Sequence, residues 1–224
     1  MLAAGGDNAA TDTRRALEEL IQAYWFPLYA FLRRQGQASA QAEDLVQGFL
    51  LRLLEKKDLA RVEREKGKFR SFLLASLKHF LANEYRKGRA LKRGGKASVV
   101  ALDAMDAEAR YAVEPVDDMT PERLFDRRWA LAVLDQVLAR LRGEYAAAGK
   151  GALYETIKDC LTGHREHLPY AELAGSLGMT EGAIKVAVHR MRRRYRDLLR
   201  DEIAQTVDSP EQVEGEIAHL LSCL

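Results

Sequence analysis

The residues most able to do chemistry are a dense run of cations near the C-terminal end of the chain. Residues 185–200 hold seven Lys and Arg residues against one acid, Asp197, a net charge of +6. Cations this dense along roughly four to five turns of helix repel one another unless a polyanion neutralises them. Nucleic-acid phosphates form such a polyanion, so the residue types predict binding rather than a reaction.

The elements that would position these cations are two helices around a tight turn, in residues 169–200. Apolar residues recur at helical spacing from Tyr170 to Leu177. Gly178 suits the left-handed conformation that ends a helix, and Thr180 can cap the next one. The pattern predicts a helix-turn-helix whose second helix can enter a major groove. A helical hairpin with a solvated basic face is the alternative, and the charge density favours DNA binding.

Charge is distributed unevenly along the whole chain, although the formal net charge is only +2. Residues 61–96 hold twelve Lys and Arg against three acids, whereas residues 101–126 hold eight acids against two Arg. Residues 201–224 carry six acids and no Lys or Arg. Two basic regions separated by an acidic one indicate two contacts with nucleic acid.

The sequence gives little support for metal binding, for catalysis or for a membrane-spanning segment. Cys160 and Cys223 match no metal-ligand spacing, and His164 and His167 lack the HExxH arrangement, so we expect no metal, no cofactor and no enzymatic activity. Gly95-Lys96 lacks the preceding glycine and the following Ser or Thr of a phosphate-binding loop. No stretch approaches membrane-spanning length, and we expect a cytoplasmic protein.

The periodicity predicts an all-α protein of two small helical domains joined by a flexible acidic linker. After a disordered tail at 1–12, the first domain covers 13–98, and Pro27 is expected to kink or split its first helix. The linker covers 99–119 because no helical period is sustained there. The second domain, 120–206, contains the helix-turn-helix, and an acidic helix lies within 207–224. For that last helix, packing is the default role, and masking of a basic patch or partner binding are alternatives.

Three segments carry a resemblance to a known family. They are AEDLVQGFLLRLLEK at 42–56, KFRSFLLASLKHFLANEYRKGR at 68–89 and PYAELAGSLGMTEGAIKVAVHRMRRRYRDLL at 169–199. In this order the chain resembles the sigma-70 family of bacterial RNA polymerase initiation factors, in particular the two-domain extracytoplasmic-function (ECF) group. The resemblance implies a sigma factor that binds core RNA polymerase and promoter DNA, recognises the −35 and −10 elements and melts the −10 region.

The resemblance also implies roles for individual residues of the first domain. The 42–56 segment is similar to the surface that docks on the polymerase, and the implied contacts are Glu43, Asp44, Gln47 and Arg52. The competing interpretation is that Glu43 and Asp44 complement a helix dipole. The 68–89 segment and the loop after it are similar to the part that opens the −10 element. The implied DNA contacts are Arg70, Lys78, Asn83, Tyr85, Arg86, Lys87, Arg89, Lys92 and Arg93.

In the second domain the resemblance places the reader of the −35 element on the helix-turn-helix. The implied DNA-binding residues are Thr180, Lys185, Val186, His189, Arg190, Arg192, Arg193 and Arg196. The last three are expected to contact phosphates, which position a helix without conveying sequence. The acidic linker resembles the family's interdomain segment, which threads toward the RNA exit path.

The chain departs from the family's pattern at Gly48, where an acid is common in the docking segment. Some ECF groups with few acids there are linked to serine/threonine kinases, so control by a kinase is one hypothesis and control by an anti-sigma factor is another. A phosphate group would add roughly −1.5 to −2 charge. The alternative function is a stand-alone helix-turn-helix regulator that binds duplex DNA without polymerase, which would leave residues 42–56 and 68–96 unexplained.

Overall fold

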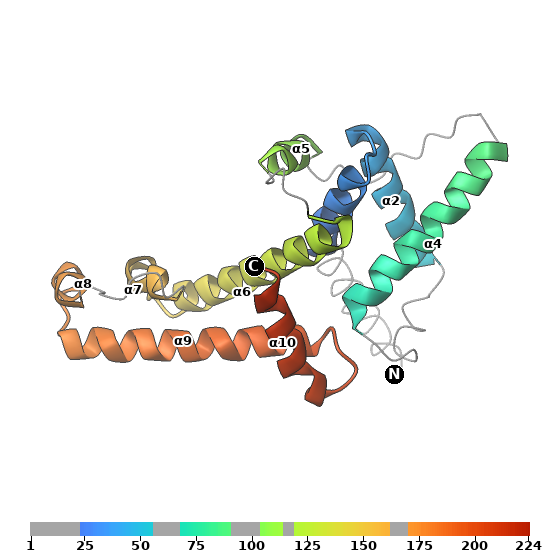
Figure 1. The fold of residues 1–224 in the computed structure, drawn as a ribbon. Coiled ribbons are helices and arrows are strands. Elements are labelled where there is room, and N and C mark those ends of the chain that lie inside the picture. The colour runs from blue at the N-terminus through green and yellow to red at the C-terminus, as the bar shows by residue number, and fades with distance from the viewer. Residues whose placement is uncertain (1–22, 56–67, 91–103, 114–118, 162–169) are drawn as a thin grey trace, which may run out of the picture. The chain divides into compact units, whose positions relative to one another are not determined.

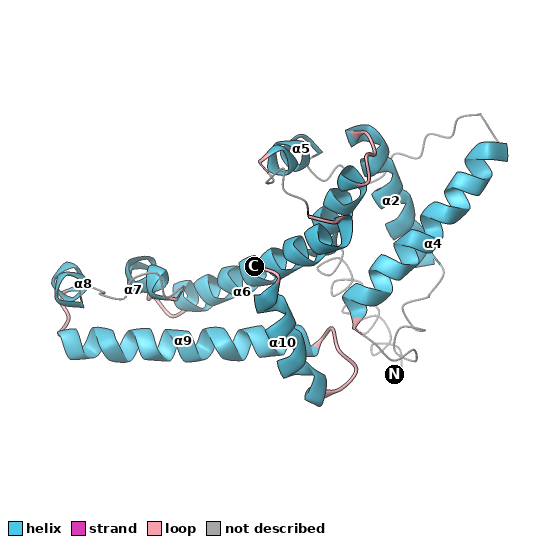
Figure 2. Ribbon diagram, in the orientation of Figure 1, coloured by secondary structure: helices cyan, strands magenta, loops and turns pink. Residues whose placement is uncertain are grey.

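A computed structural model describes residues 23–55, 68–90, 104–113, 119–161 and 170–224. All regular structure within these ranges is helical and none is strand (Figures 1 and 2). The predicted all-α class is therefore confirmed. Within the same ranges, no helix combines the length and the apolar character that crossing a bilayer requires.

The chain divides into two compact units. The first comprises residues Met1–Ala132 together with Thr206–Leu224, and the second comprises Val133–Gln205. Helix α6, Pro121–Ala147, belongs to both, because the division falls inside it. The acidic C-terminal helix is thus grouped with the first unit, although it follows the second unit in the sequence.

The first unit is built around a helix at 23–34, whose apolar residues are almost fully enclosed. Leu28, Phe31 and Leu32 are 0 % exposed. The helix runs through Pro27 without interruption, so the predicted split does not occur. Proline removes one backbone hydrogen bond, and the burial of so many apolar residues on the same helix offsets that loss.

Helix α2, Ser39–Glu55, packs against helix α4, Phe69–Ala90, within this unit (Figure 1). The rings of Phe49 and Phe80 lie 5.8 Å apart at the contact, and Phe69 is also buried, whereas Phe72 is half-buried. Gly48 faces the same contact, and a Cβ atom there would lie 3.5 Å from Cζ of Phe80, which is an ordinary van der Waals distance. Packing therefore does not require glycine at position 48.

The predicted linker contains a helix that sequence periodicity did not indicate, α5 at Ala104–Ala112. Arg33 donates to both carboxylate oxygens of Glu108, from Nε at 3.0 Å and from Nη2 at 2.6 Å. The hydroxyl of Tyr29 also donates to Glu108, and the guanidinium of Arg110 lies 4.2 Å from the ring centroid of Phe26. Contacts with the helix at 23–34 hold α5, which is too short for a period of its own to be recognised.

The second unit contains the end of α6, helix α7 at Gly151–Ile157 with a 3₁₀ turn at Lys158–Cys160, and the helices α8, Tyr170–Leu177, and α9, Glu181–Ala204. Helix α8 packs against α9. Gly178 takes a φ of +62°, and Oγ1 of Thr180 accepts from the backbone N–H of Ala183 at 3.2 Å. The predicted turn and cap are both present. The buried residues of α9 are Ile184, Val188, Met191, Leu198, Leu199 and Ile203.

The C-terminal segment consists of a 3₁₀ turn at Pro210–Gln212 and helix α10 at Val213–Ser222. It is joined to the first unit by a backbone hydrogen bond of 3.0 Å from the N–H of Phe69 to the carbonyl of Thr206. That N–H is one of the donors that the first turn of α4 cannot satisfy within the helix. The buried residues of α10 are Val213, Glu216 and Leu220, so a carboxylate lies in the middle of its packed face.

Candidate nucleic-acid and polymerase interfaces

The predicted docking residues lie along α2 at differing exposure. Asp44 is exposed, whereas Glu43, Gln47 and Arg52 are half-buried. Asp44 and Gln47 are three residues apart and are therefore neighbours on the helix surface. The side chain of Glu43 is fixed within α2, because Oγ of Ser39, one turn earlier, donates to its Oε1 at 3.1 Å. The helix thus presents one fully exposed carboxylate, with a polar side chain beside it.

A second group of predicted residues lies together near the C-terminal end of α4. The side chain of Tyr85 is 50 % exposed, and Nε2 of Gln37 donates to its hydroxyl at 2.5 Å. Nη2 of Arg86 donates to Oδ1 of Asn83 at 2.9 Å, which places an amide, a phenol ring and a guanidinium within one turn. An exposed ring next to a cation is the combination that binds an unstacked base and its phosphate.

The structure describes only some of the other basic residues that were predicted for this region. Lys87 and Arg89 belong to α4, and Lys92 and Arg93 lie outside the described residues. Lys78 is exposed in the middle of the helix, where its Nζ lies 2.8 Å from Oε1 of Glu122. The structure therefore brings Asn83 and Arg86 into contact at the end of α4, whereas the hydroxyl of Tyr85, in the same cluster along the sequence, contacts Gln37.

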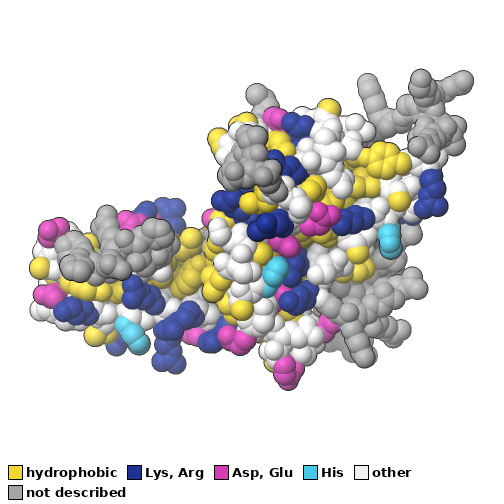
Figure 3. Space-filling model, viewed as in Figure 1, with side chains coloured by type: hydrophobic (Ala, Val, Ile, Leu, Met, Phe, Trp, Pro, Cys, Tyr) yellow, Lys and Arg dark blue, Asp and Glu magenta, His cyan; other side chains and the backbone are white. Residues whose placement is uncertain are grey.

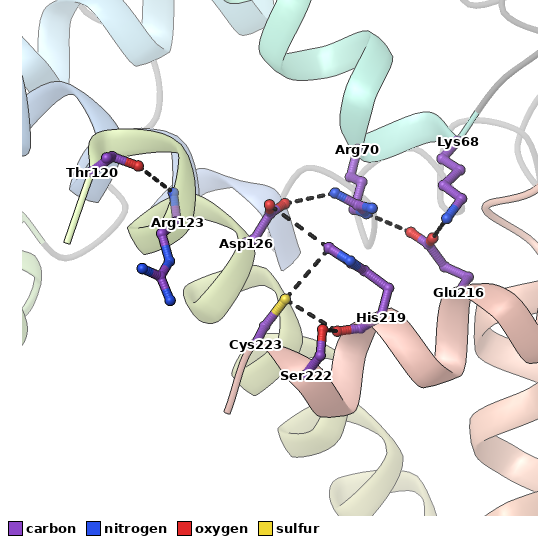
Figure 4. Close-up of polar contacts among 9 residues, drawn as sticks. All are labelled: Lys68, Arg70, Thr120, Arg123, Asp126, Glu216, His219, Ser222 and Cys223. Atoms are coloured by element: carbon purple, nitrogen blue, oxygen red, sulfur yellow. Dashed lines mark hydrogen bonds and ion pairs between the residues drawn. The ribbon is translucent and has the colours of Figure 1, made fainter.

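Arg70 lies at the opposite end of α4 from this cluster, about 24 Å away for sixteen residues of helix. Its Nη1 lies 2.7 Å from Oδ1 of Asp126 on α6, and its Nε lies 2.5 Å from Oε1 of Glu216 on α10 (Figure 4). Its guanidinium also lies 5.1 Å from the ring centroid of Trp129. In this structure Arg70 is engaged by the protein itself, and it is largely enclosed, with 11 % of its side chain exposed.

We call the residues around Arg70 the α4–α6–α10 ion cluster, and its members are Lys68, Arg70, Asp126 and Glu216. Nζ of Lys68 lies 2.5 Å from the second carboxylate oxygen of Glu216, whose side chain is 1 % exposed. Burial alone would raise the pKa of Glu216, but hydrogen bonds from Arg70 and Lys68 outweigh it and hold this pKa below its ordinary value. The two cations thus keep a buried carboxylate ionised.

Sequence reasoning could not find the partners of Arg70. Glu216 is 146 residues away in the sequence and Asp126 is 56 residues away. Asp126 lies at the end of the acidic region 101–126 and Glu216 in the acidic C-terminal segment, but no local spacing connects them to α4. The alternation of basic and acidic regions along the chain was the only available signal.

Helix α9 carries most of the residues predicted to read the −35 element. Lys185, His189, Arg193 and Arg196 are exposed, and Lys and Arg side chains gather along this helix (Figure 3). Lys185 pairs with Glu181 one turn earlier, at 2.7 Å. These residues form a basic surface on α9, which we call the α9 cationic face.

Three members of the predicted set lie differently from the α9 cationic face. The guanidinium of Arg192 donates twice to the carbonyl of Cys160, at 3.0 and 2.8 Å, and so ties α9 to the turn after α7. Val186, 49 % exposed, and Arg190 line a groove of about 640 Å³ that also contacts Tyr145 and Leu153. The predicted set is therefore divided among the cationic face, this groove, the contact of Arg192 with Cys160 and the cap at Thr180.

Among the described residues, no group of three His, Cys, Asp or Glu side chains is arranged to hold a metal ion. The nearest approach to a nucleophile is Cys223, whose Sγ lies 3.4 Å from Nε2 of His219. The same ring nitrogen lies 3.7 Å from Oδ2 of Asp126, so the imidazole cannot relay a proton between two different nitrogens. Burial raises the pKa of the Cys223 thiol, which disfavours the nucleophilic thiolate.

Comparison with known proteins gives a match within the first unit. The family model of Sigma-70 region 2 matches residues 18–90, which include the helix at 23–34, α2 and α4. No match is found among the curated proteins or among the solved structures. Sigma-70 region 2 supports a role in binding RNA polymerase, in melting promoter DNA and thus in transcription initiation. Residues 18–90 are therefore similar to region 2 of the sigma-70 family of RNA polymerase sigma factors.

Proposed function

We propose that the protein is an ECF-type sigma factor that docks on core RNA polymerase through α2, recognises the −35 element through α9 and opens the −10 element with the end of α4. The observation that carries this proposal is the match of residues 18–90 to Sigma-70 region 2, within which the end of α4 carries the exposed ring of Tyr85 and the exposed guanidinium of Arg86, bonded to Asn83. Melted DNA needs both a surface for unstacked bases and cations for phosphates. The end of α4 offers both.

The second unit supports the assignment of −35 recognition. Helix α9 begins at a capped turn, packs on α8 through its apolar side and exposes the α9 cationic face. A helix that presents exposed cations after a short turn has the form of a recognition helix. In this proposal Lys185 and His189 contact bases or the backbone, and Arg193 and Arg196 contact phosphates.

The same proposal includes regulation, which would act by changing the affinity of the α2 docking surface for polymerase. Asp44 is the one exposed carboxylate among the predicted docking residues, and Gly48, one turn later, contributes no side chain. An anti-sigma factor that covers α2, or a kinase that adds negative charge to the chain, would then control the affinity for polymerase. A phosphate-free preparation that binds core polymerase at full strength would contradict the kinase version.

Stacking by Tyr85 provides a direct test of promoter melting. Tyr85→Ala should weaken the binding of the polymerase complex to a fork-junction DNA by about tenfold, because a base stacked on an aromatic ring contributes about 1–3 kcal/mol. Tyr85→Phe keeps the ring and loses only the bond from Gln37. It should bind the same DNA almost as well as the wild type.

The measurement is the affinity of the reconstituted complex for fork DNA, followed by transcription from a library of genomic fragments. Loss of binding in both Tyr85 variants would assign the effect to the hydroxyl and contradict stacking. A chain that forms no complex with core polymerase and directs no transcript would contradict the proposed function itself.

A further inference from the structure

The C-terminal segment occupies a position that a nucleic acid could use. Lys68 and Arg70 stand together at the start of α4, two residues apart, and both are directed at the carboxylate of Glu216 (Figure 4). A paired ammonium and guanidinium would hold a phosphate group in the same way. The protein's own carboxylate is therefore seated where a backbone phosphate would be held.

The contact that holds α10 in place is small. Apart from Glu216, only Val213 and Leu220 of this ten-residue helix are buried. Leu221 and Leu224 remain exposed at 58 % and 53 %. Helices with few buried apolar residues open at low cost relative to the whole fold. Release of α10 therefore requires replacing the partner of Lys68 and Arg70 and breaking the contacts of His219 with Asp126, at 3.7 Å, and with the ring of Trp129.

The charges of the cluster are balanced only while α10 is bound. Two cations face two carboxylates, and one of these, Asp126, belongs to α6 and stays when α10 leaves. Without Glu216, Lys68 and Arg70 face a single acid. A buried ion pair contributes little stability beyond what an apolar pair of the same size would give, so stability alone does not explain the acid at this position.

We propose that α10 is an autoinhibitory helix whose Glu216 competes with a nucleic-acid phosphate for Lys68 and Arg70. The proposal rests on the proposed function, since it assumes that α4 faces DNA. In the free protein α10 covers the start of α4. When the protein engages DNA, a phosphate takes the place of the Glu216 carboxylate and α10 is released.

The test measures binding of fluorescein-labelled oligothymidine to the full chain as a function of salt. Glu216→Gln removes the competing charge, and Glu214→Gln removes the same charge from an exposed position on the same helix. We expect Glu216→Gln to bind severalfold more tightly than Glu214→Gln. The slope of log affinity against log salt should also steepen by about 0.7, because each phosphate of a single strand that is neutralised adds about 0.7.

A second substitution assigns the gain to the cluster. Lys68→Gln, at a side chain that is 34 % exposed, should cancel much of the gain when it is combined with Glu216→Gln. Hydrogen exchange of residues 213–222 provides an independent readout, and it should accelerate when DNA is added to the wild type. Equal affinities for the two Gln variants, or unchanged exchange with DNA bound, would overturn the proposal and leave α10 as a packing element.

Failure of this proposal can be distinguished from failure of the proposed function. If Glu216→Gln and Glu214→Gln behave alike while the chain still binds core polymerase, autoinhibition is wrong and the sigma assignment stands. If neither variant nor the wild type binds DNA or polymerase, both proposals are wrong.

Discussion

Replacing Arg70 with Ala is expected to lower the free energy of unfolding of the first unit by about 3 kcal/mol. The substitution leaves Glu216, which is 1 % exposed, with Lys68 as its remaining cation, and it leaves Asp126 without the guanidinium. Removing one member of a buried ion pair costs about 3–5 kcal/mol because the other charge stays buried. We expect a loss at the lower end of this range, since Lys68 still neutralises part of the charge of Glu216.

The measurement is denaturant unfolding followed by tryptophan fluorescence. The chain has two tryptophans, Trp25 and Trp129, and both belong to the first unit, so their signal reports on that unit alone. The matched control is Lys78→Ala, which breaks an ion pair between the same two helices, α4 and α6, at side chains that are 45 % and 44 % exposed. Exposed pairs contribute less than about 1 kcal/mol. Equal losses in the two variants would contradict the account of a buried ion cluster.

The same cluster predicts a dependence on pH. The folded-state pKa of Glu216 is lowered, so the stability it contributes is present above the ordinary carboxyl pKa and is lost as the pH falls through the folded value. The charged groups facing it are Lys68, just before α4, and Arg70 on α4, and Arg70 in turn pairs with Asp126 on α6, which His219 on α10 also approaches. The stability difference between wild type and Arg70→Ala should therefore shrink in acid, because a protonated Glu216 no longer needs the guanidinium.

Replacing Arg193 and Arg196 with Gln is expected to weaken duplex DNA binding strongly and without regard to sequence. Both side chains are exposed on the α9 cationic face, where phosphates position a helix but convey no base identity. Each lost phosphate contact on duplex DNA reduces the slope of log affinity against log salt by about 0.9. The double variant should thus lose about 1.8 of that slope.

The control for this prediction is Arg140→Gln combined with Arg142→Gln. Both arginines are exposed on α6 in the same unit, so the change in net charge is identical. Salt titrations of promoter and unrelated duplexes should show the large change only for the α9 variant. A loss confined to promoter DNA would assign the two arginines to base recognition, and equal losses for both variants would contradict the cationic face as the binding surface.

Several parts of the fold that local sequence patterns determine were predicted correctly, although the split at Pro27 does not occur. The turn between α8 and α9 depends on Gly178 and Thr180, whose chemistry acts over three or four residues. The buried stripe of α9 follows from its period. The core position of Phe69 and Phe80 follows from their spacing and from the hydrophobic effect.

The parts that depend on contacts between distant segments were not predictable. Helix α5 is stabilised by Glu108 and Arg33, which lie 75 residues apart. The resemblance and their charge implied DNA contacts for Arg70 and Arg192, yet in the structure one is enclosed by two carboxylates and the other binds the carbonyl of Cys160. A cation's position along a sequence gives its charge but not its partner, and tertiary packing decides the partner.

The most direct test of the central claim is binding of the full chain to bacterial core RNA polymerase in the absence of DNA. The wild type should form a stable complex, and Asp44→Ala combined with Gln47→Ala should bind more than tenfold more weakly, as expected when a charged contact worth about 1.5–3 kcal/mol is lost. The control, Glu122→Ala on α6, should bind like the wild type. A wild-type chain that fails to bind polymerase would contradict the account, and undiminished binding by the α2 variant would remove α2 as the docking surface.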